Sequence, residues 1–108
     1  MANVYKILGQ VADASANDVE LYRQTGVETI VSSIVVCNRE NAANTFRIAT
    51  KTDDSAVANT DYLAYDTSIA ANDTVTLTLG ITLEAGAEIS VGASDANVTF
   101  NAFGTQIS

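Results

Sequence analysis

The clearest pattern along the chain is the alternation of apolar and polar residues over Asp73–Leu79. Val75, Leu77 and Leu79 fall on one side of an extended backbone, and three threonines fall on the other side. Successive side chains of a strand point to opposite faces, and β-branched threonines suit the exposed face of a pleated sheet. The pattern therefore predicts a half-buried β-strand, and we expect the other strands to cover its apolar side chains.

Similar short runs recur at intervals of about 8–12 residues, separated by polar or glycine-containing turns. No stretch has a helical pattern longer than a single turn. The expected strands are Asn3–Gly9, Val19–Arg23, Val27–Asn38, Thr45–Lys51, Asp61–Ile69, Asp73–Leu79, Ile81–Leu83, Glu88–Ala93 and Val98–Ala102. About eight or nine short strands predict a single all-β domain over residues 1–108, an antiparallel β-sandwich of jelly-roll or immunoglobulin-like type, with a barrel as the second possibility.

Some apolar residues fall where a sandwich core does not need them. Val27–Asn38 is the longest apolar run and has apolar residues on both faces, which favours a central strand covered on each side or a strand with a second protomer behind it. Tyr62 and Tyr65 are three residues apart, so we expect them on opposite faces of their strand, one in the core and one at a rim or interface. The residues expected at an interface are Ile30, Val31, Val35, Tyr62, Tyr65 and Phe103, the last of which follows the alternation of its strand out of phase.

Composition narrows the possible partners. The chain has 108 residues, is 47% hydrophobic, and carries a net charge of −8 from 13 acidic and 5 basic residues. Phosphate binding relies on clustered lysine and arginine, so this balance argues against nucleic acid and anionic membranes as partners. No apolar run approaches the ~18 residues of a membrane span, and the first residues do not resemble a signal peptide. We therefore expect the protein to stay in the cytosol where it is made, or to assemble into something built there.

Candidate chemistry is sparse. The chain has no histidine and one cysteine, which excludes a zinc site of the ordinary nitrogen and sulfur type and an intrachain disulfide. Cys37 is expected to be a small buried apolar residue. Two loops contain oxygen-bearing side chains that a hard cation can use. One has Asp13, Asn17 and Asp18, and the other has or is flanked by Asp53, Asp54 and Asp61. Neither loop has the spacing of a known calcium motif, so we expect these side chains to be solvated and to bind no cation. We expect no catalytic residues, no metal and no cofactor, and therefore no enzyme.

Several segments over most of the chain also occur together in a known group of proteins. They are Tyr5–Gln10, Val31–Arg39, Thr45–Ala49, Asn72–Thr74, Leu77–Leu83 and Phe100–Gly104. As a set they resemble a group of small phage-encoded β proteins, many of them from marine and cyanobacterial tailed phages. Members of that group tend to have a Val-Pro-Ala segment where Gln24–Val27 stands here, and the missing proline should loosen this turn without altering the sandwich.

The resemblance implies a structural protein of the virion, and it supplies no site residues. The leading hypothesis is a capsid decoration (cement) protein that binds the major capsid protein from outside, as a symmetric homo-oligomer with a trimer favoured. One alternative is a tail, neck or fibre accessory protein of the same virion, with another virion protein as its partner. A second alternative is a carbohydrate-binding adsorption module, which would need Tyr22, Tyr62 or Tyr65 exposed on one concave face.

Overall fold

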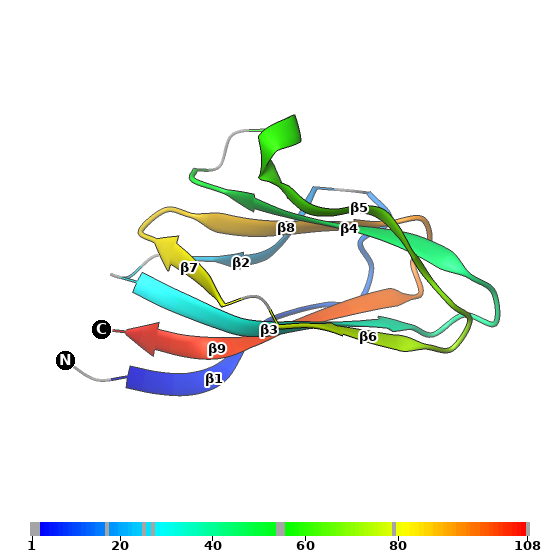
Figure 1. Cartoon of the computed structure of the whole chain (residues 1–108), viewed down its shortest axis with the longest axis horizontal. Helices are drawn as coiled ribbons and strands as arrows, with labels where there is room; N and C mark the ends of the chain where they lie inside the picture. Colours follow the sequence, from blue (N-terminus) through cyan, green and yellow to red (C-terminus); the bar gives the residue numbers. More distant parts are fainter. Residues whose placement is uncertain are drawn as a thin grey trace.

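Two antiparallel β-sheets face each other in the computed structural model, which describes residues 3–16, 18–24, 26, 28–53, 56–78 and 80–107 (Figure 1). Sheet A, the lower layer in Figure 1, has the strand order β1 (Asn3–Val11), β9 (Val98–Ile107), β3 (Glu28–Asn38) and β6 (Thr74–Leu77), and β7 (Ile81–Glu84) also pairs with β3. Sheet B has the order β2 (Val19–Arg23), β8 (Glu88–Ala93), β4 (Asn44–Lys51) and β5 (Tyr62–Ile69). A short 3₁₀ turn, η1 (Asn59–Asp61), precedes β5.

The strand pairs are nested along the chain. β4 pairs with β5, β3 with β6 and β7, β2 with β8, and β1 with β9. If β6 and β7 are counted as one interrupted strand along β3, this is a long antiparallel ribbon folded over itself, which is the jelly-roll topology. The predicted all-β sandwich is confirmed, and the barrel is wrong because the sheets are not closed into one.

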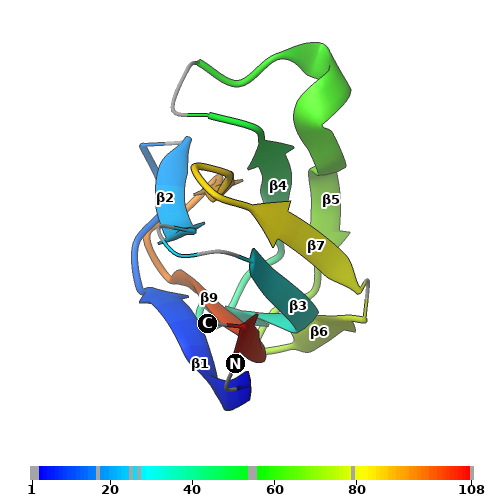
Figure 2. The same cartoon turned by 90° about the vertical axis from the view of Figure 1, so that its left-hand side faces the viewer.

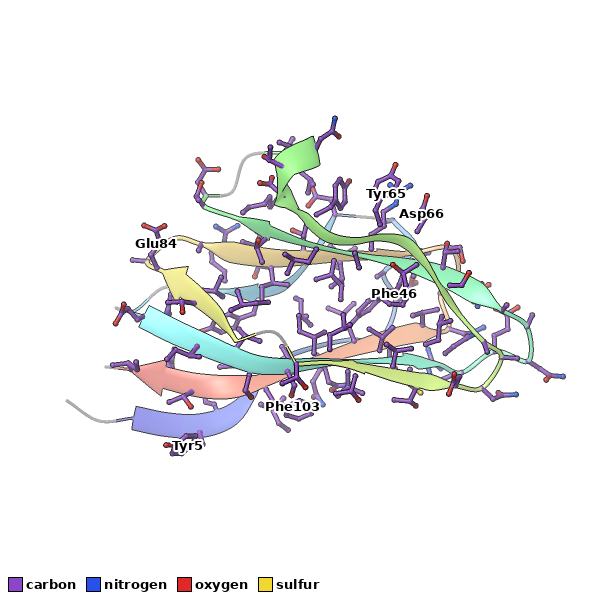
Figure 3. All side chains as sticks on the ribbon, viewed as in Figure 1. Tyr5, Phe46, Tyr65, Asp66, Glu84 and Phe103 are labelled. Carbon is purple, nitrogen blue, oxygen red and sulfur yellow. The ribbon has the colours of Figure 1, made fainter. Side chains whose placement is uncertain are left out.

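The core lies between the two sheets and consists of the inward positions of their strands. Phe46 of β4 points into the space between the sheets (Figure 3) and meets Phe100 of β9 edge to face, with ring centroids 6.3 Å apart. Branched aliphatic side chains that are fully buried surround them: Ile34, Val36, Ile48, Ile69, Ile89, Val91 and Val98. Alternation along most strands therefore places one apolar row inside and leaves the other row outside, whereas every residue of β8 is buried.

The central strand β3 differs from the predicted alternation at one point. Ile34 and Val36 face the core, and at the other end of the strand Val31 is buried and Ile30 is 40% exposed. The register between β3 and β9 shifts between Val31 and Ser33, so Ser32 is an extra residue. A bulge of this kind reverses the inside–outside phase of a strand, which is why Val31 faces the core and Ile30 faces outward.

Two other expectations are corrected or limited. Val75 and Leu77 of β6 pack against the core from the sheet edge, as the alternation over Asp73–Leu79 predicted, whereas Leu79 lies outside the described residues. Cys37 is not a core residue, because it lies half-buried on the outer side of β3 between the buried Val36 and Asn38.

The two ends of the described chain meet at one end of the sandwich. Asn3 of β1 pairs with Ile107 of β9, and Figure 2 shows both termini at that end. No helix among the described residues is long and apolar enough to cross a membrane.

Candidate interaction surfaces

The outer side of sheet A carries rows of uncharged side chains. Residues paired across neighbouring strands point to the same side of a sheet, so the register places Tyr5, Thr105, Ile30 and Thr82 in one row. The rows that follow towards the other end of the sandwich are Ile7 with Phe103 and Ser33, then Gln10 with Asn101, Val35 and Thr76, then Thr99 with Cys37 and Thr74. We call these four rows the sheet A face.

The apolar side chains of the sheet A face gather over β1, β9 and β3. Tyr5 is 81% exposed and Ile7 is 53% exposed, which is unusual for side chains of this size. A shallow groove of about 460 Å³ is lined by Tyr5, Lys6, Ile7, Ser32 and Phe103. Tyr5 and Phe103 point away from sheet B, and no other described segment covers them (Figure 3).

Charged side chains are absent from the sheet A face among the residues that the structure describes. The acids that border it are Glu28 and Glu84, which pair with each other one row beyond Ile30, and Asp73, which precedes Thr74 and accepts from its backbone N–H. Lys6 is next to Tyr5 on β1, but its register with Gly104 and Val31 assigns it to the core side of the sheet. A chain with 13 acidic residues thus has one broad uncharged face.

The six residues expected at an interface fall in three different places. Ile30, Val35 and Phe103 lie together on the sheet A face. Val31 is 1% exposed and points into the core because of the bulge at Ser32, so its assignment to an interface is corrected. The remaining two residues, Tyr62 and Tyr65, belong to β5 of sheet B, on the opposite side of the sandwich.

Tyr62 and Tyr65 share one surface, contrary to the expectation from their spacing. Their rings meet edge to face with centroids 4.8 Å apart. β5 has extra residues relative to β4 on both sides of Ala64, and Asp66 has a left-handed backbone with φ of 48°. These two irregularities remove the simple two-residue period on which the expectation was based.

An ion pair between Arg47 and Asp66 packs against the ring of Tyr65. The Arg47 guanidinium donates to both carboxylate oxygens of Asp66, at 2.7 and 3.2 Å, and stands 4.2 Å from the centroid of the Tyr65 ring. The hydrogen bond from Arg47 lowers the pKa of Asp66 below its usual value. Beside the pair is a hollow of about 280 Å³, lined also by Thr45, Ala93 and Ser94.

A second charged cluster is buried on the outer side of sheet B. Lys51 Nζ lies 3.1 Å from Asp18 Oδ1 and 3.4 Å from Glu88 Oε2, and the side chains of Lys51 and Glu88 are each only 5% exposed. Glu88 also accepts hydrogen bonds from Arg23 and Ser90. Burial alone would lower the pKa of Lys51, but the hydrogen bond to Asp18 and the charges of Glu88 and Asp18 raise it. Each charged group of the cluster has a partner of opposite charge, so we assign the cluster a structural role.

The described acids of the two loops have protein partners. Asp13 accepts from the hydroxyl and the backbone N–H of Ser15, which lowers the pKa of Asp13, and Asp61 accepts from the backbone N–H of Ala58. Asp18 pairs with Lys51. Among the described residues no three histidine, cysteine, aspartate or glutamate side chains are grouped to hold a metal ion, while Asn17 and Asp54 lie outside them.

No protein-family model and no curated protein sequence matches this chain. The sheet A face is therefore the strongest basis for a functional argument. Sequence reasoning placed three of its residues but missed its extent. The available signal was the outward positions of the expected strands, where threonine, serine, asparagine and glutamine stand in place of charged residues.

Proposed function

We propose that this chain is a non-enzymatic structural protein of a tailed-phage virion, a capsid decoration protein that binds the outer face of the major capsid shell. The observation that supports the proposal is the sheet A face. Depletion of charge together with exposed aromatic and aliphatic side chains is the composition of the centre of a protein–protein interface. In an assembly such a face is covered by another protein subunit, which can be a second copy of this chain.

The fold and the remaining charge agree with this role. Jelly-roll domains are frequent in viral capsids, although they are also frequent in lectins, so the fold alone does not decide between these functions. The acidic groups lie on the end loops, the sheet rims and the outer side of sheet B, as Asp13, Asp61, Glu84 and Asp95 illustrate. This surface repels nucleic acid and suits a position outside a DNA-filled shell.

The proposed partners are the major capsid protein, or another virion protein, and further copies of this chain. The same features suit a tail, neck or fibre accessory protein, because such a protein also needs a rigid domain and a contact face. Both positions are in the virion, and assembly would take place in the host cytoplasm.

A carbohydrate-binding adsorption module is the second candidate, and the exposure of Tyr65 is the observation that favours it. Tyr65 is 57% exposed beside a hollow that also contains Arg47 and Asp66. However, Arg47 and Tyr62 already pack against the Tyr65 ring, which leaves less of it for stacking on a sugar. Tyr22 does not contribute, because its hydroxyl is bound by Thr29 and Gln106 at the end of the core.

The position of the chain in a cryo-EM map of whole particles tests the proposal. Density on the outer capsid, at symmetry or local symmetry axes of the shell, is the expected result. Density confined to the tail or neck would replace decoration by the accessory role. Absence from purified particles would remove both roles, and glycan binding that is lost in Tyr65→Ala would then support the carbohydrate module.

A further inference from the structure

We propose that the sheet A face is the contact between two copies of this chain, packed face to face around a two-fold axis. The argument begins with the size of the face. Four strands spaced by about 4.8 Å and four rows spaced by about 6.8 Å give a footprint of roughly 500 Å² per copy. Two copies would bury roughly 1,000 Å² in total, which is the lower limit for a specific interface.

The charge distribution favours a second copy of the chain as the partner that covers the sheet A face. A basic partner would be matched by acids within the contact, and the described part of the sheet A face has none. Two copies that each carry a net charge of −8 repel one another, and they approach at least cost through surfaces without acids. If the strands of the two copies run in opposite directions, Glu28 and Glu84 of one copy lie towards the Cys37 end of the other, which is bordered by Arg39 and Asp73, and away from the partner's Glu28 and Glu84.

Pairing through the face is favoured over pairing through the sheet edge. β1 is the long edge strand of sheet A, but its register with β9 shifts between Ile7 and Gly9, and Lys6 is a charge on its core-facing side. Bulges and inward-pointing charges are the usual means by which edge strands avoid pairing with another chain. The outward rows next to them have no such protection: Tyr5 and Ile7 are exposed apolar side chains.

The geometry also determines the symmetry. A single patch that contacts its own copy forms an isologous pair around a two-fold axis, whereas a three-fold ring needs two different patches that fit each other. The other exposed large apolar residues among those described are Leu63 and Tyr65 on sheet B and Val4 at the start of β1. The structure therefore favours a dimer over the trimer expected from the sequence.

The experiment is sedimentation velocity of the purified full chain over a concentration series, with two matched variants. The wild type is expected to reach twice its 11.3 kDa mass as concentration rises. Ile30→Glu places a charge in the sheet A face, opposite apolar side chains of the partner, and should weaken the dimer by at least about 30-fold, the effect of losing one strong interface contact. Leu63→Glu changes a side chain of similar exposure on the other sheet, 47% against 40%, and should leave the dimer intact. Circular dichroism and thermal unfolding check that both variants fold.

Each contrary result has a definite meaning. The inference would be overturned by a wild type that stays monomeric up to about 1 mM, because a dimer with a weaker affinity than this is not a specific complex. A wild type that forms a trimer would also overturn it. So would a dimer that Leu63→Glu dissociates and Ile30→Glu does not. A monomeric wild type whose incorporation into particles is lost in Ile30→Glu would assign the face to another virion protein, keeping the proposed function and ending this inference. A chain that forms the dimer in solution but is absent from purified particles would keep this inference and end the proposed function.

Discussion

Gly104 stands where two strand backbones approach closely, next to the bulge in β3. A Cβ atom at this position would clash with the carbonyl oxygen of Ile30 and stand 2.9 Å from Val31 Cα. Both are backbone atoms, so no side-chain rotation relieves the overlap. The requirement for glycine here follows from tertiary packing, because β9 is regular strand and any other residue suits it locally.

We expect Gly104→Ala to lower the free energy of unfolding by about 3 kcal/mol, because β9 and β3 must separate to admit the methyl group. Urea unfolding followed by circular dichroism measures the change. Gly26→Ala is the control, since its Cβ would meet only Gln24 Oε1 at an ordinary 3.6 Å, and we expect a change within about 1 kcal/mol. Equal losses in the two variants would contradict the packing argument.

The ion pairs of Lys51 should make the free energy of unfolding fall at high pH. Its pKa is raised in the folded state, so the folded protein binds this proton more tightly than the unfolded chain does. The resulting stability is complete below the unfolded value of 10.5 and is lost as the pH rises through the folded pKa. The difference in unfolding free energy between wild type and Lys51→Met should be constant from pH 7 to about 10 and should narrow above that.

Urea unfolding of both proteins over this pH range gives the difference directly. Lys6→Met is the matched control, because exposed Lys6 forms no ion pair with any described residue. Its difference from the wild type should not change over the same range. A Lys51→Met difference that widened at high pH would contradict the direction of the pKa shift.

Asn38, at the end of β3, joins two of the turns that connect the elements. Its amide donates to the carbonyl of Ala42 at 2.8 Å and to that of Ala70 at 3.1 Å, and its oxygen accepts from the Glu40 backbone N–H and the Asn44 side chain. The side chain is buried, so these groups have no water to replace a lost partner. It therefore fixes the β3–β4 turn against the β5–β6 turn.

We expect Asn38→Ala to lower the free energy of unfolding by about 2 kcal/mol, the cost of leaving several buried polar groups unpaired. Hydrogen exchange should show the loss first in the two turns, before the sheets are affected. Asn41→Ala removes one hydrogen bond between exposed side chains and should change stability by less than about 0.5 kcal/mol. The prediction fails if the two variants unfold alike.

The strands could be predicted from the sequence because each has its own alternation, as in β6 and β9. The bulges could not, because an extra residue such as Ser32 or Asp66 is defined only by the partner strand that it exceeds. Because the bulges were not predicted, Val31 was expected at an interface but lies in the core, and Tyr62 and Tyr65 were expected on opposite faces but lie side by side. Pairing between distant strands was equally out of reach, so the sequence indicated a sandwich but did not select its topology.

At the scale of the whole molecule, net charge and the sheet A face together predict how self-association responds to salt. Each copy has a net charge of −8, and its uncharged face provides no attractive ion pairs across the proposed contact. Salt screens the repulsion between the copies and leaves apolar contacts in place. We expect the dimer to become several-fold tighter between about 0.02 and 0.5 M sodium chloride.

Sedimentation equilibrium at several salt concentrations measures this dependence. A contact held by ion pairs, such as one through Arg47 and Asp66 on sheet B, would weaken with salt instead. A dimer that dissociates on adding salt would therefore place the contact away from the sheet A face.

The position of β9 has a consequence for synthesis of the protein. The last strand of the described chain lies inside sheet A, between β1 and β3, so the first strand has no neighbour in its sheet until the last one has left the ribosome. Local contacts cannot complete either layer early, and pairing of distant segments is slow because a long loop must first close. The nascent chain must therefore remain soluble while its future core is uncovered, and its acidic character helps it to do so. Sheet A of this jelly roll can therefore close only after β9 has been synthesised.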